Sequence, residues 1–97
     1  MKIKLERTDD YKAQRRDLSP SAKIALYFVE QAIQSNPDEP PGFGYRRYRI
    51  PELGGIVVTV VENGELLVGY HWLIRPTTVS MDLALDRRRG ADWYSSE

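Results

Sequence analysis

The sequence predicts a small α+β domain in which one amphipathic helix, at about 19–35, packs on a mostly antiparallel sheet. Three observations carry the prediction: a helical pattern with clear ends, an Asn-Gly turn between two apolar runs, and further segments in which apolar and polar residues alternate. A sheet of four to five strands is expected, at about 2–6, 45–50, 56–62, 65–74 and 79–85.

The first element is a short strand. Ile3 and Leu5 alternate with charged neighbours, which is the period of a strand with one buried face. The segment 8–17 that follows is dense in charge and has little periodicity. Two interpretations of it stay open, a solvated loop and a weak helical turn that begins at Asp9 or Asp10.

The helix has clear ends. Ser19 is a good N-cap because its hydroxyl can accept from an unpaired backbone N–H of the first turn, and Pro20 suits the first helical position. Pro37 disfavours helix in the residue before it, so the helix should end near Ser35. The stripe expected to face the sheet comprises Ala25, Phe28, Val29 and Ala32, widened by Leu26 and Ile33.

A hairpin is the strongest signal in the second half of the chain. Residues 56–61 are a β-branched run, and Asn63-Gly64 before the next apolar run predicts a two-residue turn. This turn would place Val61 opposite Leu66. One face of the hairpin would then carry Ile56, Val58, Val60, Leu67, Gly69, His71 and Leu73, and the other Val57, Thr59, Val61, Leu66, Val68, Tyr70 and Trp72.

The last periodic segment is 79–85, where apolar and polar residues alternate. We expect a further strand there, at an edge of the sheet, with a short helix as the alternative. A single domain should therefore span residues 1–86. Residues 87–97 lack a periodic pattern and are expected to form a mobile tail.

Composition limits the classes of function. The chain has 97 residues with 14 basic and 14 acidic side chains, and residues 1–50 hold 10 of the basic and 7 of the acidic ones. The lack of cysteine excludes a disulfide, a thiolate zinc site and a cysteine nucleophile, and one histidine excludes a multi-histidine metal site. We see neither a signal peptide nor the roughly 18–20 apolar residues of a membrane span. A cytoplasmic protein without a cofactor is expected.

The strand at 45–50 carries the first candidate site. Tyr45, Arg47 and Arg49 point to one side of it, and Tyr48 and Ile50 point to the other. If the helix covers the Tyr48 side, the first three form an open basic face that can hold phosphates and stack on bases. The alternative is a solvated strand face that pairs with acidic neighbours or with a partner protein.

His71 and Arg75 are the second candidate site. They lie four residues apart, about 13 Å along an extended strand, which is far enough to span a nucleotide. An imidazole titrates near neutral pH, so His71 can act as a general acid or base. The alternative is a half-buried histidine with a satisfied hydrogen bond.

Two groups of aromatic residues are weaker candidates. Tyr70 and Trp72 share a face lined with aliphatic residues, and core packing against the helix explains them more simply. The run 87–89 is three arginines, and with Trp93 and Tyr94 it can dock on nucleic acid or on a partner. A solvated tail is the alternative.

The order of these elements resembles the small bacterial toxins of the RelE/ParE superfamily, including its YoeB-like branch. The resemblance is best over residues 42–75. Gly-Phe-Gly-Tyr-Arg-Arg-Tyr-Arg-Ile looks like the strand that opens the family's sheet, and Ile-Val-Val-Thr-Val-Val-Glu-Asn-Gly-Glu-Leu-Leu-Val looks like its central hairpin. Ile56 stands where the family has an arginine, and one clear helix stands where it has a helical hairpin.

The resemblance implies an intracellular toxin that an antitoxin holds silent. RelE-like members cut messenger RNA on the ribosome by activating the ribose 2′-hydroxyl without a metal, whereas ParE-like members poison DNA gyrase. Carried over to this chain, Arg47, Arg49 and Arg75 would neutralise phosphate and His71 would transfer the proton. The expected partners are a cognate antitoxin or another protein, and RNA or the ribosome, but no membrane.

Two other hypotheses stay open, and with them the question of whether the chain is catalytic. The first is a non-catalytic interaction module, such as a degenerate toxin, an antitoxin or immunity protein, or a phage-type inhibitor. Zero net charge and an edge strand suited to pairing with another chain favour it. The second is a homodimer of unassigned role.

Overall fold

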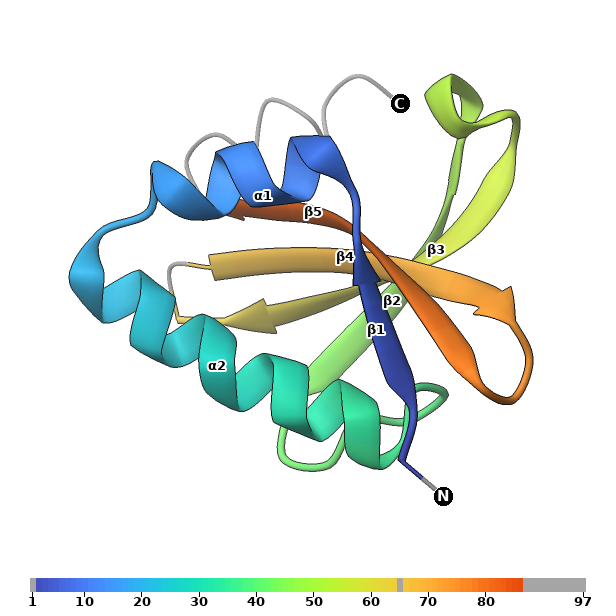
Figure 1. Ribbon diagram of the computed structural model, residues 1–97, viewed down its shortest axis with the longest axis horizontal. Coiled ribbons are helices and arrows are strands. Elements are labelled where there is room, and N and C mark those ends of the chain that lie inside the picture. Colours follow the sequence, from blue (N-terminus) through green and yellow to red (C-terminus); the bar gives the residue numbers. More distant parts are fainter. Residues whose placement is uncertain (1, 65, 87–97) are drawn as a thin grey trace.

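The computed structural model describes residues 2–64 and 66–86, and the expected tail at 87–97 lies outside them. Two helices pack on one face of a five-stranded sheet (Figure 1), so the α+β prediction is confirmed. The elements are β1 (Lys4–Arg7), α1 (Asp9–Arg16), α2 (Pro20–Ser35), β2 (Gly44–Ile50), the 3₁₀ helix η1 (Pro51–Leu53), β3 (Ile56–Asn63), β4 (Leu66–Ile74) and β5 (Thr78–Asp86).

The strand order is β1-β5-β4-β3-β2. β1 runs parallel to β5 and all other neighbours are antiparallel, which fits the prediction of a mostly antiparallel sheet. The strand expected at 79–85 is present as β5, but its expected place at an edge is wrong. The two helices carry the chain from β1 at one edge of the sheet to β2 at the other edge, and the strands β2 to β5 then bring β5 beside β1. Alternation alone does not encode this long-range pairing.

The segment after β1, left open between a loop and a helical turn, is the helix α1. Thr8 caps it by accepting from the backbone N–H of Tyr11, and acidic residues in the first turn and arginines in the last suit the helix dipole. Tyr11 is the one buried residue of α1, with 0% of its surface exposed. A helix that one side chain anchors has no apolar stripe, and therefore no periodic signal.

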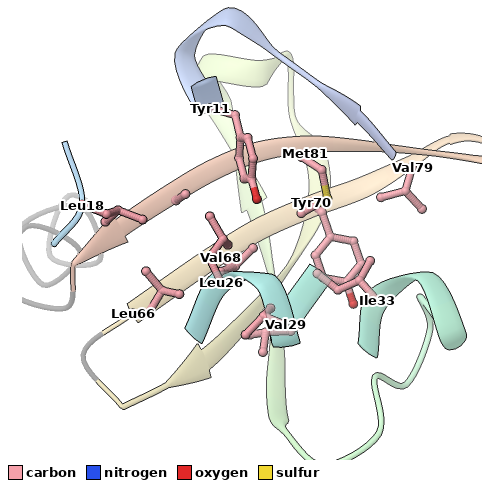
Figure 2. Packing of buried hydrophobic residues seen from close by; sticks show 12 residues of the cluster. Tyr11, Leu18, Leu26, Val29, Ile33, Leu66, Val68, Tyr70, Val79 and Met81 are labelled. Atoms are coloured by element: carbon pink, nitrogen blue, oxygen red, sulfur yellow. The ribbon is translucent and has the colours of Figure 1, made fainter. Parts of the chain in front are cut away.

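α2 begins and ends as expected, and the Ser19 hydroxyl accepts from the backbone N–H of Ala22 at 3.2 Å. The buried stripe is Leu26, Val29 and Ile33, which point at the sheet in Figure 2. Phe28 was expected to share this stripe and instead is 55% exposed. The apolar residues of α2 extend around much of its circumference, so periodicity did not determine which of them face the sheet.

A buried polar contact joins β1 and both helices. Glu30 of α2 accepts hydrogen bonds from Arg7, at 3.1 Å from Nε and 3.0 Å from Nη2. The Tyr11 hydroxyl donates to the same carboxylate at 2.6 Å. Burial, with help from this bond, raises the pKa of Tyr11. The contact lets α2 bury a carboxylate because the charge is paired and hydrogen-bonded.

The central hairpin forms, with a register two residues from the expected one. Val61 faces Val68 rather than Leu66, and the last pair is Asn63 with Leu66. The turn therefore starts at Gly64, whose φ of +58° suits glycine. A shift of two keeps the side chains of the paired residues on their expected faces. The helix side holds Val61, Leu66, Val68 and Tyr70, and the opposite side holds Val58, Val60 and Leu67.

Pairing between β3 and β4 stops before either strand ends. The register runs from Asn63–Leu66 to Thr59–Tyr70, while residues 56–58 of β3 stay paired with β2 and residues 71–74 of β4 stay beside β5. Figure 1 shows β2 and β3 diverging from β4 and β5 in this part of the sheet. We call the two segments 56–58 and 71–74 the fork.

Candidate functional site

A group of polar and aromatic side chains meets around Asp38, in the loop between α2 and β2. The Asp38 carboxylate accepts from Trp72 Nε1 at 2.8 Å and from Arg75 Nη1 at 3.1 Å to Oδ2 and 3.3 Å to Oδ1. Arg47 Nη2 donates to the Asp38 backbone oxygen at 3.2 Å. With Tyr45, which contacts Arg47, these residues form what we call the Asp38 cluster: Asp38, Tyr45, Arg47, Trp72 and Arg75.

Each arginine of the cluster lies over an aromatic ring. The guanidinium carbon of Arg47 is 5.3 Å from the ring centroid of Tyr45, and that of Arg75 is 4.9 Å from the centroid of Trp72. Both distances are in the range of a cation–π contact. The side chain of Arg75 is 62% exposed, so solvent or a ligand reaches this part of the cluster.

The loop that carries Asp38 is held on the sheet by Tyr70. The buried Tyr70 hydroxyl donates to the Pro37 backbone oxygen at 2.6 Å, one residue before Asp38. Asn36, the C-cap of α2, accepts from the backbone N–H of Glu39 through its side chain at 3.3 Å. Hydrogen bonds from Trp72 and then Arg75 lower the pKa of Asp38. The carboxylate therefore stays ionised and orients both donors.

The cluster contains three of the five residues that the sequence indicated. Tyr45, Arg47 and Arg75 come together, and Arg49 does not, because its Nη1 donates to the Gly55 backbone oxygen at 2.9 Å beyond the end of β2. The helices cover the opposite face of β2 from the one supposed. Tyr45 packs against the hydrophobic core under the helices, whereas Ile50 and Tyr48 belong to a second hydrophobic core on the other face of the sheet.

His71 lies on the opposite face of the sheet, in a chain of hydrogen bonds with two β5 residues. Its Nδ1 is 2.7 Å from Asp82 Oδ2, and the Ser80 hydroxyl donates to Asp82 Oδ1 at 2.9 Å. Burial raises the pKa of Asp82, and the bonds from His71 and Ser80 oppose that rise. Asp82 orients the imidazole. Ser80 bonds to the carboxylate rather than to His71, so the three are not arranged as a nucleophile and its base.

A β-bulge separates His71 from Arg75. The pairing of β4 with β5 shifts between Trp72 and Ile74, so one residue of β4 leaves the regular alternation. Arg75 therefore joins Trp72 on the helix side instead of following His71. The sheet lies between the two side chains that were expected to act together.

Asp38 was missed as a site residue, and Trp72 was indicated only as a weaker candidate. Trp72 was interpreted as a core aromatic, and it is half-buried with its Nε1 bonded to Asp38. Asp38 sits in a proline-rich loop without periodicity. The only signal for it is an acid close to three prolines, which is a pattern of ordinary loops.

Residues 2–64 and 66–86 hold no group of three or more His, Cys, Asp or Glu side chains able to bind a metal. In the same residues no helix is long and apolar enough to cross a membrane. No protein-family model, curated protein or solved structure matches the chain. Its function therefore has to be argued from the residues themselves.

Proposed function

We propose that this chain is a RelE/ParE-type domain that acts on RNA or the translation machinery, and that it contacts RNA through the Asp38 cluster. The observation that carries the proposal is the pairing of two arginines with two aromatic rings in one solvent-accessible group. Guanidinium groups hold phosphates by paired hydrogen bonds, and planar rings and guanidinium planes stack on unpaired bases. The cluster supplies both kinds of contact.

The arrangement of the cluster suits a single-stranded ligand. Tyr45 and Arg47 come from β2, whereas Trp72 comes from β4 and Arg75 directly follows the last residue of β4, so the two stacked pairs come from different parts of the sheet. Asp38 connects them, since it bonds to both arginines. A flexible chain can address two such pairs with successive nucleotides, whereas stacked bases in a duplex are hidden from rings.

The order of elements also supports the proposal. The resemblance implies a helical hairpin between the first two strands, where the sequence indicates only one clear helix. α1 and α2 are two consecutive helices at that place.

The geometry supports RNA binding better than RNA cleavage. Activation of a ribose 2′-hydroxyl needs a proton acceptor and a positive charge at the same phosphate. His71 and Arg75 lie on opposite faces of the sheet, and Ile56 occupies the place of a family arginine. His71, oriented by Asp82, remains the candidate for proton transfer at a site separate from the Asp38 cluster.

The binding test compares two double variants with equal loss of charge. A fluorescein-labelled single-stranded RNA of mixed sequence is titrated with the wild-type protein, with Arg47→Ala/Arg75→Ala and with Arg15→Ala/Arg16→Ala from the exposed end of α1. A hydrogen bond to a charged group contributes about 1.5–3 kcal/mol, so the first variant, which loses two guanidinium groups, should bind at least about tenfold more weakly. The second should lose much less. Equal losses would reveal a general charge effect and remove the Asp38 cluster as the site.

A growth experiment tests the biological part of the proposal. Expression in a cell without a matching antitoxin should arrest growth, and Arg47→Ala/Arg75→Ala should relieve the arrest. If ribosome-bound messages are cut, His71→Ala should abolish cutting and leave RNA binding unchanged. Normal growth with intact messages would contradict the proposal.

A non-catalytic interaction module is the second candidate function. Seven large apolar side chains of the described residues are at least 41% exposed: Ile24, Tyr27, Phe28, Ile56, Val57, Leu73 and Ile74. Exposed apolar groups of this kind mark interaction surfaces. A growth effect that survives both Arg47→Ala/Arg75→Ala and His71→Ala would favour this function over the first.

A further inference from the structure

The fork is where the registered pairing between two inner strands of the sheet ends, with Ile56 and Val57 exposed and Val58 buried. Residues 56–58 have β2 on one side, and the registered pairing with β4 on the other side has ended at Thr59. Residues 71–74 likewise have β5 on one side only. Alternate N–H and C=O groups of a strand point to each side, so both segments offer the pattern of groups that another strand would pair with.

Apolar side chains flank these edges on both faces of the sheet. Ile56 is 41% exposed and Val57 is 45% exposed, and as neighbours in a strand they point to opposite faces. Across the fork, Leu73 is 50% and Ile74 59% exposed. A strand entering between the segments would have apolar neighbours above and below, which suits a run of apolar residues.

The chemistry of the fork selects an extended peptide. Its seven residues, 56–58 and 71–74, include no Lys, Arg, Asp or Glu, so the fork itself does not provide the charges that a phosphate chain would need. A helix cannot pair with a strand edge, because its backbone groups are already bonded within the helix. Exposed edges are ordinarily protected by charges, and here that protection is missing.

The border of the fork adds a charge preference. Arg49 is the cross-strand neighbour of Val57, and its guanidinium bonds to the Gly55 backbone oxygen at 2.9 Å. Arg75 follows the last residue of the β4 segment, with Asp38 as its carboxylate partner. Because the charge of Arg75 is already paired with Asp38, a guest segment with an acidic residue beside its apolar run would complement Arg49.

We propose that the fork binds an extended apolar segment, flanked by an acidic residue, from a partner protein, and that this segment adds to the edge of β3 at residues 56–58. The added strand would extend the ladder that stops at Thr59–Tyr70. The fork shares Trp72 with the Asp38 cluster and borders on Arg75, but the two proposals concern different ligands, and either can fail alone.

The test uses a random-peptide phage library selected on the wild-type protein. Selected peptides are then measured by fluorescence anisotropy on Val57→Lys and on Tyr27→Lys, whose wild-type side chains are 45% and 55% exposed and which gain the same charge. The expected peptides have an apolar run next to an acidic residue. They should bind Val57→Lys at least tenfold more weakly than wild type and bind Tyr27→Lys normally. N-methylation of alternate residues should abolish binding, because it removes the donors of one strand edge.

Leu73→Lys, on the β4 side of the fork, serves as the second variant if thermal melts show that Val57→Lys is not folded. Failure to select any peptide whose binding these variants weaken would overturn the proposal, and so would peptides that tolerate N-methylation. Light scattering tests whether a second copy of this chain occupies the fork. A wild-type dimer that Val57→Lys or Leu73→Lys dissociates would show that a second copy, rather than a partner segment, fills the fork.

Discussion

Tyr11→Phe isolates one hydrogen bond in the centre of the protein. The ring of Tyr11 is 0% exposed and anchors α1, and its hydroxyl donates to Glu30 Oε2 at 2.6 Å. Phenylalanine keeps the ring and removes only the hydroxyl. Glu30 retains its two bonds from Arg7, so the carboxylate is not left without a partner. The change therefore measures the loss of one short, buried bond to a charged group.

A hydrogen bond to a charged group contributes about 1.5–3 kcal/mol to stability, and we expect Tyr11→Phe to lower the free energy of unfolding by that amount. Urea unfolding followed by circular dichroism measures it, with the slope against urea unchanged. Tyr27→Phe is the matched control, since this tyrosine is 55% exposed and its hydroxyl accepts from Gln31 at the surface. The control should change stability by less than about 0.5 kcal/mol. An equally small effect of Tyr11→Phe would refute the reasoning that the buried contact stabilises the fold.

Two further predictions follow from the packing of α2 and from the buried tyrosines. Leu26→Ala should lower the free energy of unfolding by about 2–5 kcal/mol, measured in urea, because Leu26 is 0% exposed. Phe28→Ala should lower it much less, because the Phe28 side chain is 55% exposed. Similar losses would contradict the finding that Leu26, and not Phe28, faces the sheet. Burial raises the pKa of both Tyr11 and Tyr70 above the ordinary 10.0, so each binds its proton more tightly in the folded state. Their contribution to stability is complete below pH 10.0 and is lost as pH rises beyond it, which thermal melts at increasing alkaline pH would show. The loss should be smaller in Tyr11→Phe than in wild type.

The sequence was most informative where structure depends on neighbours along the chain. Ser19, Pro20 and Pro37 act within one turn of the ends of α2, and the helix has the expected bounds. The β-branched run and Gly64 are similarly local, and the hairpin forms with its faces as expected. The α+β class followed from these elements, since an amphipathic helix and half-apolar strands have to cover one another.

Features that depend on contacts between residues far apart in the sequence could not be predicted from local patterns. α1 relies on Tyr11 reaching Glu30, 19 residues away, so its own sequence shows no stripe. The inner position of β5 depends on parallel pairing with β1, and α1, α2 and three further strands separate β1 from β5 in the chain. Periodicity also could not predict which side of α2 faces the sheet. Phe28 and Leu26 are both apolar, and only packing against the sheet buries Leu26 and leaves Phe28 exposed.

The candidate site divides in the same way. The sequence alone determined which residues are able to hold phosphate, stack on a base or transfer a proton, because that ability belongs to the side chain itself. These residues are Tyr45, Arg47, Arg49, His71 and Arg75. Only the tertiary structure decided which of them meet. A bulge in β4 turned Arg75 toward Trp72 and Asp38 and away from His71, since one residue outside the alternation moves all that follow it to the other face.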